Sequence, residues 1–114
     1  DYRLSRCDPY CTVQLQPALG AEGVNRTLIQ FNTSFPVWNE QFPYTVPPDA
    51  TLHQRKLLLK VYDHDATGAI DQFGLLGEGE VDLSSLARRL ESAGPGELVQ
   101  QSQWVPLWRK RRRS

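Results

Sequence analysis

Cysteine and histidine are scarce in this sequence of 114 residues, which has two of each and no long apolar run. A membrane-spanning helix needs about 20 consecutive apolar residues, so none is predicted, and the start of the chain lacks a signal-peptide pattern. Cys7 and Cys11 lie too close together for a disulfide framework, and no second cysteine or histidine pair completes a metal-binding spacing. We therefore expect reduced thiols and a cytoplasmic protein.

An excess of charge of one sign is also lacking, but the charges are unevenly distributed. The formal net charge at pH 7 is zero, from 13 basic and 13 acidic residues. Five of the basic residues lie in the run RKRRR at positions 109–113, so residues 1–108 have 13 acidic and 8 basic residues and a net charge of −5. We expect a single domain over residues 1–108, followed by a basic tail over residues 109–114.

Short runs with period-two alternation or many β-branched residues lie between prolines and glycines. Six of them are predicted as strands: Tyr10–Gln16, Arg26–Asn32, Trp38–Val46, Lys56–Asp63, Gly77–Leu83 and Gln103–Trp108. Such strands predict an all-β, antiparallel β-sandwich. A short helix is predicted between the last two strands, because four apolar residues share one helical face: Leu83, Leu86, Ala87 and Leu90. Ser84 or Ser85 is expected to cap its start.

Aspartates are concentrated in two stretches, residues 1–8 and 63–71, which hold five of the seven in the chain. Crowded carboxylates repel one another unless a cation lies among them, and calcium takes roughly 6–8 oxygen ligands. The segment DHDATGAIDQFG, residues 63–74, matches much of an EF-hand loop, but Gly74 stands where a bidentate glutamate is required. Its flanks are predicted strands rather than helices. The residues therefore predict calcium binding without an EF-hand.

Several segments of the chain resemble, in their order, the C2 domain family of calcium- and phospholipid-binding β-sandwiches. These segments are CDPYCTVQL, FNTSFPVWNEQF, LLLKVYDHD, LLGEGEVDLSSL and QWVPL, and they cover nearly the whole chain. Their order is most similar to the synaptotagmin-type, membrane-trafficking branch. The resemblance implies a Greek-key sandwich and a further strand before the first calcium loop, inside which this chain begins. A sandwich without that strand would expose apolar surface and an open sheet edge.

The resemblance implies a metal site built from several aspartates and one backbone carbonyl. Its side-chain ligands would be Asp8, Asp63, Asp65, Asp71 and, at a spacing one residue longer than usual, Asp1, with the His64 carbonyl as the backbone ligand. The usual spacing of the family, counted forward from Asp63, favours Asp71 as the last ligand. Counted back from Gly77, it places Gly74 at that position. Alternation along a strand would turn Asp63 and Asp65 to the same side.

These features predict a module that binds anionic, phosphatidylserine-type membranes when calcium is present, peripherally and within a larger trafficking, exocytosis or signalling protein. The apolar residues expected to contact the membrane, or else to pack within their loops, are Tyr2, Leu4, Ile70 and Phe73. The basic tail is a lipid contact, a nucleic-acid or nuclear-localisation patch, or a solvated terminus. It consists of Arg109, Lys110, Arg111, Arg112 and Arg113. Its lack of aromatic residues counts against nucleic acid.

Two other classes of function remain open. One is a calcium-independent C2 domain that binds proteins, favoured by the altered spacings and by the lone Arg26 where the family often has a lysine-rich strand. The other is a metal-assisted hydrolase. No nucleophile–histidine–acid set is apparent for it, and neither His53 nor His64 completes a catalytic zinc site. We therefore predict a non-enzymatic binding module with calcium as its cofactor.

Overall fold

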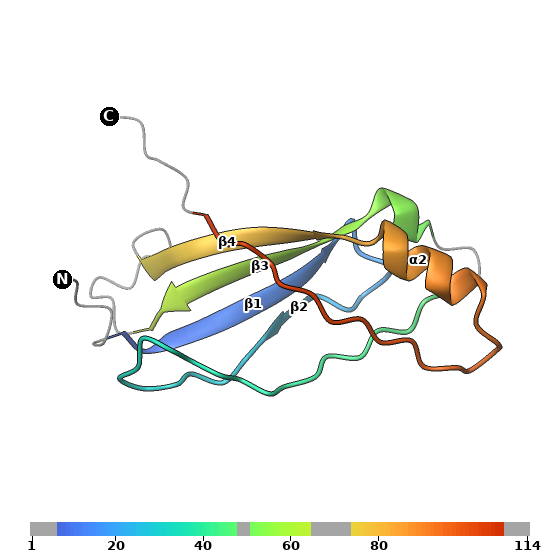
Figure 1. Ribbon diagram of the computed structural model, residues 1–114. Coiled ribbons are helices and arrows are strands. Elements are labelled where there is room, and N and C mark those ends of the chain that lie inside the picture. Colours follow the sequence, from blue (N-terminus) through green and yellow to red (C-terminus); the bar gives the residue numbers. More distant parts are fainter. Residues whose placement is uncertain (1–6, 48–50, 65–73, 109–114) are drawn as a thin grey trace, which may run out of the picture.

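The computed structural model describes residues 7–47, 51–64 and 74–108 as one antiparallel sheet with a helix at one end (Figure 1). The elements are β1 (Pro9–Gln16), β2 (Val24–Arg26), the 3-10 helix η2 (Leu52–Gln54), β3 (Lys56–Asp63), β4 (Leu75–Asp82) and α2 (Ser84–Glu91). The predicted all-β, antiparallel class with one short helix after β4 is therefore confirmed.

The sheet has the strand order β2-β1-β3-β4, and every neighbouring pair is antiparallel. In β1 the buried residues are Pro9, Cys11 and Leu15, which are separated by even numbers of positions. Gly77, Gly79 and Val81 alternate in the same way in β4. Because side chains of a strand point alternately to its two faces, these residues line one face of the sheet.

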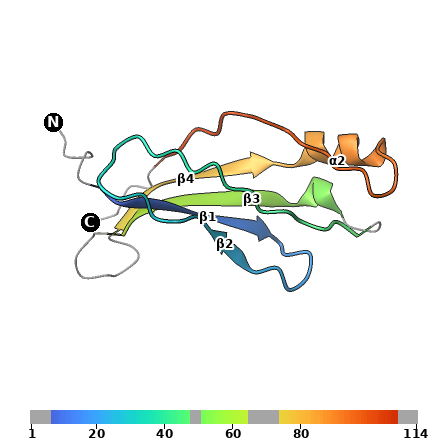
Figure 2. The ribbon, with the colours of Figure 1, turned by 90° about the horizontal axis from the view of Figure 1, so that it is seen from below.

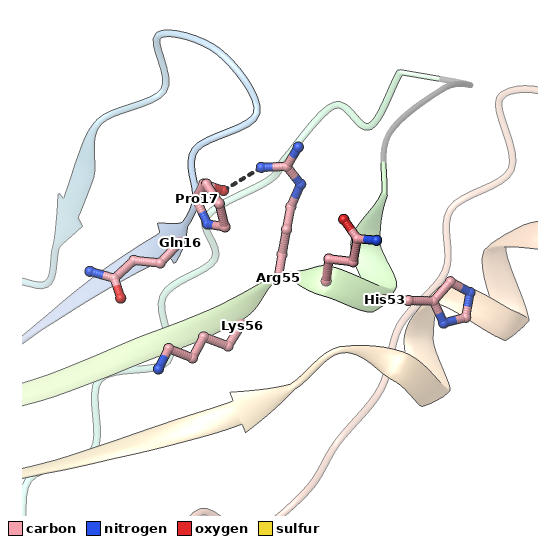
Figure 3. A pocket seen from close by; sticks show the side chains of 6 residues that line it. Gln16, Pro17, His53, Arg55 and Lys56 are labelled. Carbon is pink, nitrogen blue, oxygen red and sulfur yellow. Dashed lines mark hydrogen bonds between the residues drawn. The ribbon is translucent and has the colours of Figure 1, made fainter.

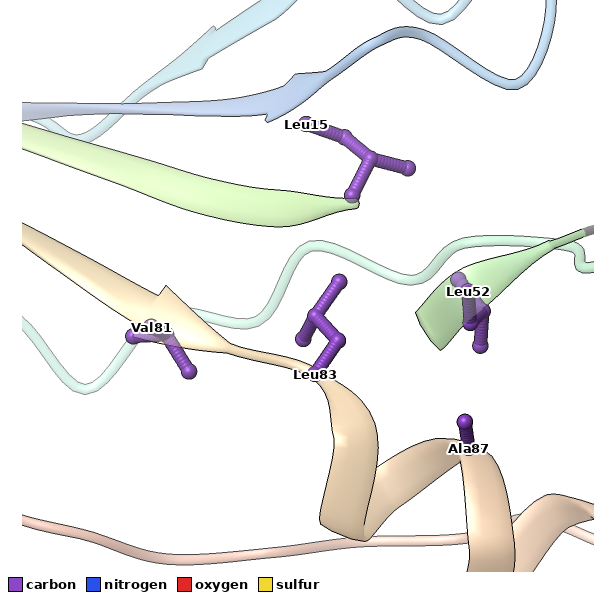
Figure 4. Packing of buried hydrophobic residues seen from close by; sticks show 5 residues of the cluster. All are labelled: Leu15, Leu52, Val81, Leu83 and Ala87. Atoms are coloured by element: carbon purple, nitrogen blue, oxygen red, sulfur yellow. The ribbon is translucent and has the colours of Figure 1, made fainter. Parts of the chain in front are cut away.

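The hydrophobic core lies on this face, toward the helical end of the sheet. Figure 4 shows its five buried side chains, which come from β1, η2, the end of β4 and α2: Leu15, Leu52, Val81, Leu83 and Ala87. Partly buried residues pack around them, including Tyr44 and Val46 from one irregular segment and Val105 from another. The core therefore joins the sheet, the helix and two segments that are not strands.

Three strand predictions differ from the structure. The predicted strand at residues 26–32 is wrong beyond Arg26, where β2 ends, and the predicted strands at 38–46 and 103–108 are absent from the described structure. Within 103–108 only Trp108 pairs, in an isolated bridge with Glu78. Both segments run over the core side of the sheet (Figures 1 and 2). A strand needs a neighbouring strand for its backbone groups, and the described residues supply none there.

The predicted helix is confirmed, but its predicted cap is wrong. Leu83 and Ala87 are buried, and Leu86 and Leu90 pack against the core. The helix begins at Ser84, so this serine lies within the first turn instead of preceding it. Asp82 Oδ1 accepts hydrogen bonds from both the Ser84 backbone N–H and its hydroxyl, each at 2.9 Å. In the described ranges, no helix has the length and apolar content needed to cross a membrane.

Gly79 allows segment 105–107 to approach the backbone of β4. A Cβ atom built at Gly79 would lie 2.7 Å from the Pro106 carbonyl oxygen and 2.9 Å from Val105 Cγ1. At Gly77 the corresponding closest atom is Leu107 Cβ, at 3.4 Å. The missing side chain at Gly79 therefore decides how closely this segment packs on the sheet.

Candidate calcium and membrane site

The pairing of β1 with β3 brings two predicted ligands together at one end of the sheet. Pro9 pairs with Asp63 in the antiparallel register, so Asp8 lies next to the point where β3 ends. The Asp8 backbone N–H donates to Asp63 Oδ1 at 3.0 Å, and the His64 N–H donates to the Asp8 carbonyl at 2.9 Å. Residues 55 positions apart in the sequence are therefore in direct contact.

The Asp8 carboxylate is oriented from the other side by the segment after β2. Its Oδ1 atom accepts the Asn32 backbone N–H at 2.7 Å. Asn32 has a φ of 57°, in the left-handed region that asparagine tolerates better than most residues. The neighbouring Thr33 N–H donates to the Cys7 carbonyl at 2.9 Å. Backbone donors from two segments thus orient both carboxylates.

Cys7 lies beside these carboxylates and is buried. Burial raises the pKa of its thiol, and Asp63, through its charge and a hydrogen bond, raises it further, as does the charge of Asp8. The pKa of Cys11 is also raised, first by burial. Both cysteines are free in the structure, and their raised pKa values keep both thiols neutral at pH 7.

The donor chemistry at this end of the sheet fits a hard cation. Asp8 and Asp63 offer carboxylate oxygens, and the neutral Cys7 thiol is a poor ligand because metals bind the thiolate. Among the described residues, no group of three or more histidine, cysteine, aspartate or glutamate side chains is placed to hold a metal ion. A calcium site at this end of the sheet would therefore need ligands from outside these residues, and the predicted ones are Asp1, Asp65 and Asp71.

The structure brings together Asp8, Asp63 and the backbone of His64, and it leaves the other predictions untested. Gly74, the alternative last ligand, is buried. The predicted ligands outside the described residues are Asp1, Asp65 and Asp71. The predicted membrane contacts Tyr2, Leu4, Ile70 and Phe73 also lie outside them, as does the basic run Arg109, Lys110, Arg111, Arg112 and Arg113. All of these roles stay predictions.

An aromatic cluster next to the carboxylates was missed by the sequence analysis. The rings of Tyr10 and Tyr62 stack with their centroids 5.4 Å apart. The His64 ring makes edge-to-face contacts with Tyr10 and Phe31, with centroid distances of 6.5 and 6.4 Å. The Arg26 guanidinium lies 5.2 Å from the centroid of the Tyr10 ring. Tyr10 stands two residues after Asp8, and Tyr62 stands one residue before Asp63. This placement in two predicted strands was the feature of the sequence that could have indicated the cluster.

At the opposite end of the sheet, a shallow pocket contains basic side chains that are already engaged. Figure 3 shows Arg55 reaching toward Pro17, whose carbonyl accepts a bond from Arg55 Nη1 at 2.7 Å. Lys56 is paired with Glu80 and His53 with Glu91, each at 3.0 Å. These carboxylates offset the positive charge, so the pocket is a weak candidate for an anion site.

A family model for the C2 domain matches residues 2–106. The chain belongs to the C2 domain family. This confirms the resemblance, and synaptotagmin-type proteins are among its relatives.

Two curated relatives show how much of a longer protein such a domain occupies. The chain is 32% identical over 99 residues to mouse cytosolic phospholipase A2 delta, covering 87% of this chain and 10% of the relative. It is 32% identical over 110 residues to bovine synaptotagmin-like protein 2, covering 96% of this chain and 11% of the relative. The chain thus spans about a tenth of the length of these proteins.

Among solved structures, a C2 domain of the protein RIM from Drosophila is similar to this one. The TM-score is 0.57 and the sequence identity is 30%. The match covers 68% of this chain and 59% of the RIM chain. The four-stranded sheet and its helix are thus part of a C2 fold.

Proposed function

We propose that this C2 domain binds anionic phospholipid membranes in a calcium-dependent manner through the end of the sheet that carries Asp8 and Asp63. The observation that supports this is the contact between these two residues, which come from segments far apart in the sequence. The proposed ligand set adds Asp1, Asp65 and Asp71, together with the backbone carbonyl of His64. Together they provide the oxygen-rich surroundings that calcium prefers.

Electrostatics explains why such a site acts as a switch. The five proposed carboxylates carry up to five negative charges, which are repelled by an anionic membrane surface. Bound calcium would offset this charge and offer coordination positions to lipid phosphate or carboxylate oxygens. Each basic charge near an anionic membrane contributes about 1 kcal/mol, and the effect decays within a Debye length of about 8 Å. A change of several charges at this end of the sheet is therefore large enough to switch membrane binding on.

The proposed membrane contact extends beyond the carboxylates. Apolar side chains near the acidic stretches would insert between lipid headgroups, and the candidates are Tyr2, Leu4, Ile70 and Phe73. The basic run at positions 109–113 would add attraction to anionic lipid. The phospholipid-binding role makes this domain a non-enzymatic targeting module in a longer cytoplasmic protein.

Sedimentation with vesicles of phosphatidylserine and phosphatidylcholine, in calcium or in a chelator, tests the proposal. We expect the chain to sediment with the vesicles in calcium and to stay in solution in the chelator. Asp63→Asn retains an oxygen that accepts the Asp8 N–H but removes the charge, and we expect it to need about tenfold more calcium or more. Glu78→Gln, on β4 and away from Asp8, is the matched control and should bind like the wild type.

A calcium-independent, protein-binding C2 domain is the alternative. It is favoured by the hydrogen bonds that already occupy Asp8 Oδ1 and Asp63 Oδ1. Calorimetry separates the two functions, because heat of calcium binding that is lost in Asp63→Asn supports the metal site. Equal sedimentation with and without calcium, or no calorimetric signal, would leave the alternative as the better description.

A further inference from the structure

Helix α2 ends at a serine that follows two arginines. The sequence of residues 88–92 is Arg-Arg-Leu-Glu-Ser, and Ser92 is the residue at the carboxyl end of the helix. Ser92 is exposed, and its hydroxyl donates to the Arg88 carbonyl at 3.4 Å, which is longer than an ordinary O–H···O bond. The Ser92 oxygen is therefore accessible from solvent. Figure 1 shows α2 at the end of the sheet opposite to the acidic site.

Both arginines line the same shallow hollow as Ser92, between α2 and residues 97–99. Side chains three and four positions apart lie on one side of a helix, so Arg89 and Arg88 are the helical neighbours of Ser92. Both are exposed, and neither forms an ion pair with another described residue. Among the residues that line the hollow the only acidic one is Glu97, whose Oε1 accepts the Gly94 backbone N–H at 2.7 Å. Two positive charges therefore lie beside one accessible hydroxyl.

The spacing of the arginines matches one class of modifying enzyme. Protein kinases with acidic substrate grooves bind an arginine three residues before the serine that they modify, and Arg89 stands at that position. Ser85 lines the same hollow, but the residue three positions before it is Asp82, which has the opposite charge. Ser114 is the only other serine or threonine in the sequence with an arginine at this spacing. Charge therefore distinguishes Ser92 from its helical neighbour Ser85.

The last turn of α2 can open to the extended form in which a kinase binds its substrate segment. Leu90 packs against the core, and it is the one side chain of residues 88–92 that is not exposed. Glu91 pairs with His53 at 3.0 Å in an exposed position. Residues 94–97 follow as an exposed turn, closed by a bond of 3.1 Å from the Glu97 N–H to the Gly94 carbonyl. Few contacts therefore oppose local opening at this helix end.

We propose that Ser92 is a phosphorylation site for a serine/threonine protein kinase that recognises arginine at this spacing, and that Arg88 and Arg89 hold the phosphate. Ser92 Oγ forms a bond to the γ-phosphorus of ATP, and the bond from this phosphorus to the oxygen of the β-phosphate breaks. ADP leaves, and the hydroxyl proton passes to a carboxylate of the kinase.

The modification changes the charge of the outer side of α2. A phosphoserine carries about −1.5 to −2 at pH 7, which offsets the two positive charges of Arg88 and Arg89. The carbonyl end of the helix and Glu91 repel the phosphate, whereas charge-assisted hydrogen bonds from the two guanidinium groups attract it. Phosphorylation therefore acts as a charge switch at the hollow, and it does not depend on calcium or lipid.

Phosphorylation of the folded chain of 114 residues, carrying Ser114→Ala, tests the site. The probe is the isolated catalytic domain of calmodulin-dependent protein kinase II with magnesium ATP and no calcium or vesicles, so the result is independent of the proposed membrane function. We expect mass spectrometry to find one phosphate, on Ser92, and none after Ser92→Ala. Arg89→Gln should slow the reaction about tenfold or more, because the kinase loses a charged contact. Ser85→Ala is the matched control and should react like its parent.

Phosphorus NMR of the phosphorylated chain tests the role of Arg88. Arg88→Gln keeps Arg89 for the kinase but removes one guanidinium from the hollow. We expect the second ionisation of the phosphate to have its midpoint about 0.3 pH unit higher in this variant, because a nearby positive charge favours the dianion. Glu91 and Glu97 are present in both proteins, so the difference reports Arg88.

Three results would overturn the proposal. One is the absence of phosphate on Ser92 of the folded chain. Another is phosphorylation of a peptide of residues 84–97 but not of the folded chain, because the helix end would then not open. The third is the same ionisation midpoint with and without Arg88, which would show that this arginine does not hold the phosphate.

Discussion

Asp8 and Asp63 have local environments that suit metal ligands, since a backbone N–H orients each carboxylate. Asp63 Oδ1 accepts from Asp8 and Asp8 Oδ1 accepts from Asn32. These backbone donors hold both carboxylates in place at this end of the sheet. The neutral thiol of Cys7 beside them adds no competing charge.

Gly79 provides a test of packing at the scale of a single residue. We expect Gly79→Ala to lower the free energy of unfolding by about 1–3 kcal/mol, because its Cβ would overlap the Pro106 carbonyl and force segment 105–107 outward. Chemical denaturation followed by tryptophan fluorescence measures the change. Gly77→Ala is the control, since its Cβ meets Leu107 at 3.4 Å and should cost less. Equal losses for the two variants would show that the close approach at Gly79 is not limiting.

At the scale of secondary-structure elements, β3 and α2 depend on different interactions. β3 has two strand neighbours, β1 and β4, and its ladder to β1 extends over its full length. Helix α2 has a core-facing apolar side, and its start depends on Asp82, whose carboxylate accepts two bonds from Ser84. The start of the helix is therefore sensitive to a single residue that precedes it, whereas β3 is not.

Asp82 also predicts how α2 responds to acid. The Ser84 backbone N–H, then its hydroxyl, lowers the pKa of Asp82 below its usual value of 3.8. The stabilisation by the carboxylate is therefore present above 3.8 and lost as the pH falls through the lower value of the folded state. We expect Asp82→Ala to reduce Tm by a few degrees at pH 7.

Thermal denaturation followed by circular dichroism checks this prediction across the pH range. Asp82→Asn keeps an oxygen acceptor but does not titrate, so it should retain most of the stability at pH 7 and lose less than the wild type in acid. An identical acid dependence in the wild type and Asp82→Asn would contradict the assigned role of the carboxylate.

At the scale of the whole molecule, the sheet holds together Asp8 and Asp63, which an unfolded chain would separate. The register of β1 and β3 determines their contact, so a ligand that needs both carboxylates binds only the folded state. Such a ligand stabilises the fold by mass action, and its effect rises with the logarithm of its concentration.

We therefore expect calcium to raise Tm. At a calcium concentration about one hundred times Kd, the added stability is about 2.7 kcal/mol, which scanning calorimetry detects easily. The double variant Asp8→Asn/Asp63→Asn should show little or no shift. A shift of the same size in that variant would place calcium elsewhere on the molecule.

The sequence predicted β1, β3, β4 and α2 well, because each has a clear apolar period or a run of β-branched and apolar residues. It did not predict that residues 38–46 would form no strand, although Trp38, Phe42 and Tyr44 keep the expected alternation. The alternation of apolar and polar residues indicates which side of a segment is buried. A strand also requires a neighbouring strand for its backbone hydrogen bonds, and the local sequence does not specify that neighbour. For the same reason the Tyr10–Tyr62 stack was missed, since it arises from register.

The amino-acid sequence by itself determined the family, the antiparallel class and the clustering of aspartates in two stretches. Composition, periodicity and motif order are properties of the sequence alone and do not depend on contacts between distant residues. Only the tertiary structure decided that Asp8 and Asp63 are in contact, and that segments 38–47 and 98–107 have no strand neighbour among the described residues. These outcomes depend on strand register and on contacts between distant residues, which local propensity does not encode.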